Sequence, residues 1–179
     1  MSLRRWERLR LARETKNPWW TYRVEEYKLP SGNRGEYRYV HTNGSSMAIH
    51  VLDDGRVILV RQYRYLCDRD SLEFPCGSVK DGSTYEQTAR LELSEEAGLQ
   101  ASELLLVGEF NPYNGVTDEM CRVYITRGFT PSAAIPDATG EFEHVYLHPP
   151  EIDAALERGE IWDGMTIAAW LLGRTKITP

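Results

Sequence analysis

Aromatic and apolar residues alternate with polar ones in the first third of the chain. The alternating residues are Trp20, Tyr22, Val24, Tyr37 and Tyr39. Between the two groups lies PSGNRG at 30–35, a run of turn-forming residues. Period-two alternation on both sides of such a turn predicts an aromatic β-hairpin. Because an isolated hairpin is only marginally stable in water, we expect it to pack on the main domain or on a second subunit.

The next apolar segments predict a buried sheet. Residues 47–52 and 57–63 are strand candidates, and the Asp54-Gly55 pair between them is a strong signal for a hairpin turn. The second segment begins with the continuous apolar run VILV, which is typical of a strand buried on both faces. Burial on both faces indicates a sheet that lies between helices.

The best-marked helix follows this sheet. Two overlapping capping boxes, S-x-x-E at 83–86 and T-x-x-Q at 84–87, open the helix, and Gly98 stands where a left-handed C-terminal residue belongs. Its apolar stripe consists of Ala89, Leu93 and Ala97. Their four-residue spacing places these three side chains on one helical face.

The remaining elements complete the fold class. Further strands are predicted at 104–110, 121–127 and 143–147, and further helices at 151–158 and 166–172. This order of hairpin, strands, helix, strands and helices indicates an α+β fold arranged as an α/β/α sandwich. We expect two parts, an N-terminal arm with the hairpin over residues 1–44 and the main domain over residues 45–179.

Composition and charge exclude several functions. The chain of 179 residues has 21 Lys and Arg against 27 Asp and Glu, a formal net charge of −6, so it lacks the basic footprint of a nucleic-acid binder. No apolar run is long enough to span a membrane. The cysteines at 67, 76 and 121 form no C-x-x-C motif, and we expect reduced thiols in a cytoplasmic protein. The Arg-rich residues 1–13 are expected to be a mobile or dimer-contacting arm.

Three glutamates on the marked helix are the first candidates for chemistry. Glu92, Glu95 and Glu96 stand at positions i, i+3 and i+4, so their carboxylates share one face and repel each other. They also lie in the C-terminal half of the helix, where its dipole disfavours anions. A divalent cation would relieve both effects, and carboxylate ligands without His or Cys favour Mg²⁺ or Mn²⁺. An ordinary charged helix face is the alternative.

The surrounding residues resemble the Nudix box, whose pattern is G-x5-E-x7-R-E-U-x-E-E-x-G-U with U a bulky aliphatic residue. The matching residues are Gly77, Glu92, Leu93, Glu95, Glu96, Gly98 and Leu99. Ser83 replaces the first Glu of the pattern and Leu91 replaces its Arg. In the family these two charged residues lie close together and help to hold the metal-binding glutamates, so losing both predicts weaker support of the metal site.

The resemblance extends to the ADP-ribose pyrophosphatases and implies roles for individual residues. It rests on residues 60–64, 72–77 and 159–169 and on the aromatic hairpin. It implies a Nudix α/β/α sandwich with a mixed sheet and a homodimer formed through the hairpin. Glu92 and Glu96 are then the main metal ligands, Glu95 assists them, and the Cys76 carbonyl completes the site. Arg64 and Glu73 would bind substrate, with a surface salt bridge as the alternative for Arg64.

Other positions bear on the substrate and on the catalytic base. Trp20 and Tyr22 could stack on a base or simply pack within the hairpin. Residues 111–119 resemble the subgroup's S-P-G-x-[ST]-x-E motif and retain its Glu119, but Asn114 replaces the proline that marks ADP-ribose specificity. The resemblance also implies that a carboxylate in the late acidic loop acts as general base. Glu141 is the first candidate and Glu143 the second, with a solvated loop carboxylate as the alternative.

Together these residues predict a Mg²⁺-dependent hydrolase that cleaves the pyrophosphate of ADP-ribose or a related nucleoside diphosphate sugar. Its products would be a nucleoside monophosphate and a sugar phosphate. Two alternatives stay open. One is a nucleotide-binding module that no longer hydrolyses its ligand, and the other is a Nudix hydrolase for a dinucleotide or a non-nucleotide diphosphate.

Overall fold

A computed structural model describes residues 3–132 and 142–177, and side chains 96 and 97 are not described. The chain divides into two compact units, one formed by Met1–Asn43 with Asn111–Glu119 and the other by Gly44–Phe110 with Met120–Pro179. Within the described residues no helix is long and apolar enough to cross a membrane.

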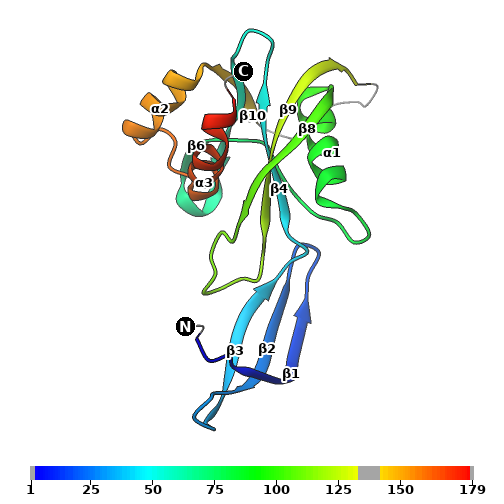
Figure 1. The fold of residues 1–179 in the computed structure, drawn as a ribbon, viewed down its shortest axis with the longest axis vertical. Helices are drawn as coiled ribbons and strands as arrows, with labels where there is room; N and C mark the ends of the chain where they lie inside the picture. The colour runs from blue at the N-terminus through cyan, green and yellow to red at the C-terminus, as the bar shows by residue number, and fades with distance from the viewer. Residues whose placement is uncertain (1–2, 133–141, 178–179) are drawn as a thin grey trace. The chain divides into compact units, whose positions relative to one another are not determined.

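The first unit is a three-stranded antiparallel sheet (Figure 1). Its strands, in the order in which they pair, are β1 (Glu7–Lys16), β2 (Thr21–Lys28) and β3 (Arg34–His41). Strands β2 and β3 confirm the predicted hairpin, and Gly32 adopts the left-handed φ of +94° that its turn requires. The segment 111–119 joins this unit because the Val40 amide donates to the Val116 carbonyl at 2.8 Å.

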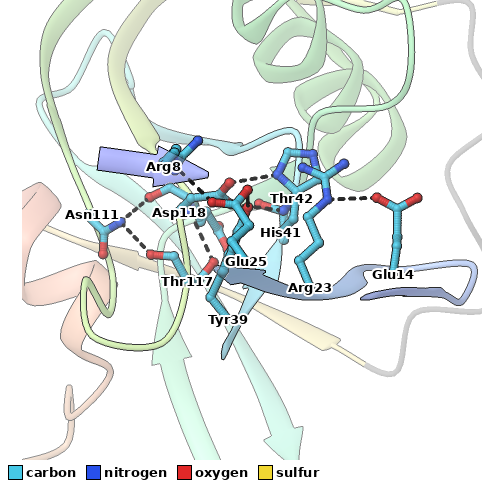
Figure 2. A network of polar contacts seen from close by, with 11 residues as sticks. Arg8, Glu14, Arg23, Glu25, Tyr39, His41, Thr42, Asn111, Thr117 and Asp118 are labelled. Carbon is cyan, nitrogen blue, oxygen red and sulfur yellow. Dashed lines mark hydrogen bonds and ion pairs between the residues drawn. The ribbon is translucent and has the colours of Figure 1, made fainter. Parts of the chain in front are cut away.

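The N-terminal residues were expected to form a mobile or dimer-contacting arm. From Glu7 onwards they form strand β1 and are not a mobile arm, while the dimer contact stays a prediction. This strand carries no apolar alternation, and nearly all of its side chains are exposed. Ion pairs across β1 and β2 take the place of apolar contacts (Figure 2). Arg8 of β1 pairs with Glu25 of β2 at 3.2 Å, and Arg23 of β2 pairs with Glu14 of β1 at 2.8 Å. Such cross-strand ion pairs stabilise a sheet without leaving a hydrophobic period in the sequence.

The second unit has a mixed sheet in the order β10-β5-β4-β9-β8, with β6 paired to β5 and β7 paired to β4. Its strands are β4 (Ser45–Val51), β5 (Val57–Arg64), β6 (Arg69–Glu73), β7 (Cys76–Ser78), β8 (Leu99–Phe110), β9 (Cys121–Pro131) and β10 (Phe142–Leu147). Strands β4 and β9 are parallel, and the other pairs are antiparallel. The short strands β6 and β7 were not predicted.

Helices lie on both faces of this sheet. They are α1 (Tyr85–Ala97), α2 (Pro149–Glu157) and α3 (Gly164–Gly173), and Figure 1 shows α1 on one side and α2 and α3 on the other. Successive residues of β4 explain this division. Met47 lies in the apolar core with Ile152 of α2 and Trp170 of α3, whereas the hydroxyl of Ser46 donates to the Tyr85 carbonyl of α1 at 2.6 Å. The predicted α/β/α sandwich with a mixed sheet is confirmed.

Candidate active site

The helix that carries the glutamates is fixed at both ends. The Thr84 side chain accepts from the Gln87 amide at 3.1 Å, and the Gln87 side chain accepts from the Thr84 amide at 2.8 Å. Of the two predicted capping boxes the second is therefore formed. At the other end, Gly98 has a left-handed φ of +63° and its amide donates to the Ser94 carbonyl at 3.1 Å.

Glu92 lies directly on the backbone of Gly77. A Cβ atom built on Gly77 would lie 1.9 Å from Oε1 of Glu92 and 2.2 Å from its Cδ. Only glycine leaves room for the carboxylate at this position, which gives a physical reason for the first residue of the box. Gly77 follows Cys76 in β7, and both residues pair with β4. The Glu92 carboxylate thus lies against the strand that contains the predicted carbonyl ligand, Cys76.

The electrostatics of Glu92 favour a bound cation. Burial raises the pKa of the Glu92 carboxyl, the neighbouring Glu95 raises it further, and Lys80 lowers it. A half-buried carboxylate beside a second carboxylate has too little positive charge around it, and a divalent cation would supply that charge. The glutamates and the Cys76 carbonyl supply the oxygen ligands that Mg²⁺ prefers, so these residues fit such an ion.

Part of the predicted ligand set lies outside the description. The side chain of Glu96 and the whole of Glu141 are among the parts of the chain that are not described. Within the described residues, no three His, Cys, Asp or Glu side chains converge as a metal site would require. Of the predicted metal ligands, the structure therefore describes Glu92, Glu95 and the backbone carbonyl of Cys76.

The two departures from the box lie together beside Glu92. Ser83 and Leu91 line one surface hollow of about 290 Å³, which Lys80 and Glu92 also line. The Nudix pattern has Glu at position 83 and Arg at position 91, so both charged side chains would line this hollow. Here a small hydroxyl and a 40% exposed leucine take that place, and Lys80 is the cation that the hollow retains.

Arg64 and Glu73 form an ion pair rather than acting as two independent groups. Arg64 Nε donates to Glu73 Oε1 at 2.7 Å, and its Nη2 donates to Oε2, which makes the pair bidentate. Glu73 is 3% exposed, and Gln62 donates to the same carboxylate at 3.4 Å. The Glu73 carboxylate holds the pKa of Arg64 above its ordinary value, with smaller contributions from Asp163 and Cys76. Glu73 thus orients a half-exposed guanidinium near Cys76.

A capping interaction that the sequence analysis missed anchors this region. Asp163 caps α3 by accepting from the amide and the hydroxyl of Thr166, both at 2.7 Å. The Phe74 amide donates to the Thr166 hydroxyl at 3.3 Å, which ties the residue after Glu73 to α3. The Asp-x-x-Thr spacing before an apolar run was the available signal.

Glu143, the second candidate for the general base, lies on a different face of the sheet from the Arg64–Glu73 pair. It pairs with Arg61 across β10 and β5, with Arg61 Nη1 donating to Glu143 Oε2 at 3.1 Å. Glu73 lies opposite Val60 in the register of β5 and β6. Because Val60 and Arg61 are consecutive, their side chains point to opposite faces. The Glu143 carboxylate, 67% exposed, therefore lies on the face opposite to the Arg64–Glu73 pair.

The other predicted substrate residues belong to the first unit. Trp20 lies in the turn between β1 and β2, where its amide donates to the Asn17 side chain at 2.9 Å, so it is not part of a strand. Tyr22 lies in β2 opposite Val40. Glu119 ends the segment 111–119, and its carbonyl accepts from the Asn111 side chain at 2.7 Å.

Comparisons with known proteins point to one family. A model of the NUDIX domain matches residues 42–169. An ADP-ribose pyrophosphatase of Mycobacterium tuberculosis is 31% identical over 153 residues, 83% of this chain and 73% of the relative. An ADP-ribose pyrophosphatase of Bacillus subtilis is 33% identical over 102 residues, 57% of this chain, and the match spans only 55% of that relative.

A methanol dehydrogenase activator of Bacillus methanolicus is 27% identical over 151 residues, 82% of this chain and 80% of the relative. A solved structure described as an ADP compounds hydrolase aligns over 99% of this chain and 96% of its own, with a TM-score of 0.85 and 20% identity, and so supports the fold. The chain belongs to the Nudix hydrolase family and is similar to its ADP-ribose pyrophosphatase-like members.

Proposed function

We propose that this Nudix hydrolase cleaves the pyrophosphate of ADP-ribose or a related nucleoside diphosphate sugar with the help of Mg²⁺. The products are a nucleoside monophosphate and a sugar phosphate. The observation that carries the proposal is the half-buried Glu92 carboxylate on the backbone of Gly77, with Glu95 on the same helical face. The two relatives named ADP-ribose pyrophosphatases support the substrate class.

Each group of the chain has a distinct task in this proposal. Glu92, Glu95 and Glu96 hold the cation together with the Cys76 carbonyl. When bound, Mg²⁺ neutralises phosphate charge and makes the attacking water more acidic. Arg64, held by Glu73, directs its remaining N–H groups to a phosphate oxygen. Glu141 accepts the proton of the attacking water or orients that water.

The composition of the hollow beside Glu92 favours one second candidate. Ser83 and Leu91 supply no charge there, which would fit a module that binds a nucleotide without hydrolysing it. The two proposals predict different results in a turnover assay. The module binds nucleotide tightly with no product, whereas the hydrolase releases product only when a divalent cation is present.

The test is product analysis with a substrate panel in Mg²⁺ and separately in Mn²⁺. The panel contains ADP-ribose, GDP-mannose, UDP-glucose, ADP-glucose, NADH and a diadenosine polyphosphate. Glu92→Gln keeps the shape of the side chain and removes its charge. Glu86→Gln is the matched control, since Glu86 lies on the same helix and pairs with Arg90 at the surface.

We expect turnover of a nucleoside diphosphate sugar by the wild type and by Glu86→Gln, and a loss of about 100-fold or more in Glu92→Gln. Equal turnover in the two variants would contradict the assigned metal site. Nucleotide binding without turnover on any substrate, in either metal, would instead support the binding module.

A further inference from the structure

The short connection between strands β6 and β7 joins two groups of the candidate active site. Glu73, which holds Arg64, is the last residue of β6, and Cys76, whose carbonyl is a predicted metal ligand, is the first residue of β7. Only Phe74 and Pro75 lie between them. Because each of these two residues adjoins one of the two groups, a shift of the connection would move Glu73, Cys76 or both.

Contacts with β4 and α3 hold this connection in place. The Ala48 amide of β4 donates to the Pro75 carbonyl at 3.0 Å. The Phe74 ring is 1% exposed, and its centroid lies 6.0 Å from that of the Trp170 ring of α3. The Phe74 amide donates to the hydroxyl of Thr166, in the first turn of α3, at 3.3 Å. Removing this hydroxyl would leave the amide of a buried residue without that acceptor.

The Thr166 hydroxyl does more than the cap of α3 requires. Asp163 caps the helix by accepting from the Thr166 amide at 2.7 Å, and this bond alone satisfies the amide. The hydroxyl of Thr166, which is 0% exposed, donates to the same Asp163 oxygen at 2.7 Å. Since a hydroxyl has a single hydrogen to donate, this bond leaves its lone pairs to accept from the Phe74 amide. Asp163 therefore orients the hydroxyl as an acceptor for the connection.

The same end of α3 also acts on Arg64. Glu73 contributes most to raising the pKa of Arg64, and Asp163 adds a smaller contribution in the same direction. The Asp163 carboxylate thus lies close enough to influence the guanidinium that Glu73 orients. The first turn of α3 therefore acts on the site in two ways, through the charge of Asp163 and through the hydroxyl of Thr166.

We propose that Thr166 is a positioning residue of this hydrolase. Through the Phe74 amide, its hydroxyl sets how the Arg64–Glu73 pair stands relative to the Cys76 carbonyl. Since a misplacement of about 1 Å can cost about 100-fold in rate, a loosened connection would impair both groups. The inference rests on the proposed function, which assigns Arg64 to a phosphate and the Cys76 carbonyl to Mg²⁺.

The experiment compares Thr166→Val, which keeps the shape of the side chain but removes the hydroxyl, with Thr166→Ser, which retains the hydroxyl. Thr126→Val is the matched control. Thr126 is also 0% exposed, and its hydroxyl lies 2.6 Å from Nδ1 of His50 rather than at the connection. Thr166→Ala takes the place of Thr166→Val if the latter does not fold.

Three quantities are measured on the full chain. They are the hydrogen exchange of the Phe74 amide by NMR, the Kd of Mg²⁺ alone by calorimetry, and kcat/KM with the best substrate of the panel. In Thr166→Val we expect the Phe74 amide to exchange about tenfold faster, the Kd of Mg²⁺ to rise about threefold or more, and kcat/KM to fall about 10- to 100-fold. Thr166→Ser and Thr126→Val should match the wild type in Mg²⁺ affinity and kcat/KM.

Unchanged Mg²⁺ affinity and kcat/KM in Thr166→Val would overturn the proposal even if the Phe74 amide exchanges faster, since the hydroxyl would then support only the fold. Equal losses in Thr126→Val would overturn it too, and so would losses in Thr166→Ser as large as those in Thr166→Val. If the wild type hydrolyses no substrate of the panel, the proposed function fails, and the Mg²⁺ affinities of the variants alone decide this inference. A wild type that binds no Mg²⁺ either would overturn both.

Discussion

The buried histidine of the central sheet gives a prediction that depends on pH. His50 lies in β4, is 0% exposed, and its Nδ1 is 2.6 Å from the hydroxyl of Thr126. Burial lowers the pKa of its imidazole to about 3, and the nearby His144 contributes in the same direction. Its Nε2 is buried without a hydrogen-bond partner in the structure, so no group stabilises a proton there.

The sign and size of the effect follow from linkage. The folded pKa lies below the ordinary value of 6.5, so the unfolded chain binds more protons than the folded chain between about pH 6.5 and 3. Stability is fully present above pH 6.5 and falls as the pH is lowered through this window. Between pH 7 and pH 5 the single group accounts for a loss of about 2 kcal/mol in the free energy of unfolding.

The assay is urea unfolding of the wild type and of His50→Asn at pH 7, 6 and 5. Asparagine can still bond to the Thr126 hydroxyl but does not titrate in this range. We expect the wild type to lose about 2 kcal/mol more than the variant between pH 7 and pH 5. Parallel pH dependences of the two proteins would refute the reasoning. An NMR titration in which His50 of the folded wild type protonates with a midpoint above pH 5 would refute it even if the variant does not fold.

The remaining predictions concern the box and its helix. Gly77→Ala pushes a Cβ into the Glu92 carboxylate, so turnover should fall about 10- to 100-fold while circular dichroism stays unchanged. Thr84→Ala removes the cap of α1 and should lower the free energy of unfolding in urea by about 1 kcal/mol, whereas Thr84→Ser should lose much less. Ser83→Glu with Leu91→Arg restores the charge pair of the family, and Mg²⁺ titration of activity should show half-maximal activation at a concentration about tenfold lower. An unchanged titration curve would show that the hollow does not support the metal site.

Much of the fold could be predicted because the elements of the second unit carry local signals. Helix α1 has its cap, its apolar stripe and its terminal glycine within a short segment, and the VILV run of β5 is buried as expected. Strand β1 could not be predicted, since its pairing with β2 depends on ion pairs between residues that are distant in sequence. Strands β6 and β7 are short and are separated by Phe74-Pro75, which obscured both.

The candidate site likewise has a part that local sequence patterns predict and a part that they do not. The identity of the glutamates follows from spacing on one helix, which a sequence displays directly. The pairing of Arg64 with Glu73 and the orientation of Glu143 depend on the register of β5 with β6 and β10. A shift of one residue would reverse the face of each side chain, and no local pattern fixes that register. Structure was therefore needed to show that Glu73 positions Arg64 and that Glu143 lies on the other face.

The hollow beside Glu92 lacks both charged residues that the Nudix pattern has at positions 83 and 91. Removing only the arginine would leave a glutamate at position 83 close to Glu92, and like charges would then raise the pKa of Glu92 further. With Ser83 and Leu91 both uncharged, that repulsion does not arise. Lys80 lines the same hollow and is the cation that lowers the pKa of Glu92. The positive charge that acts on Glu92 in this hollow thus comes from the loop before α1 rather than from the helix itself.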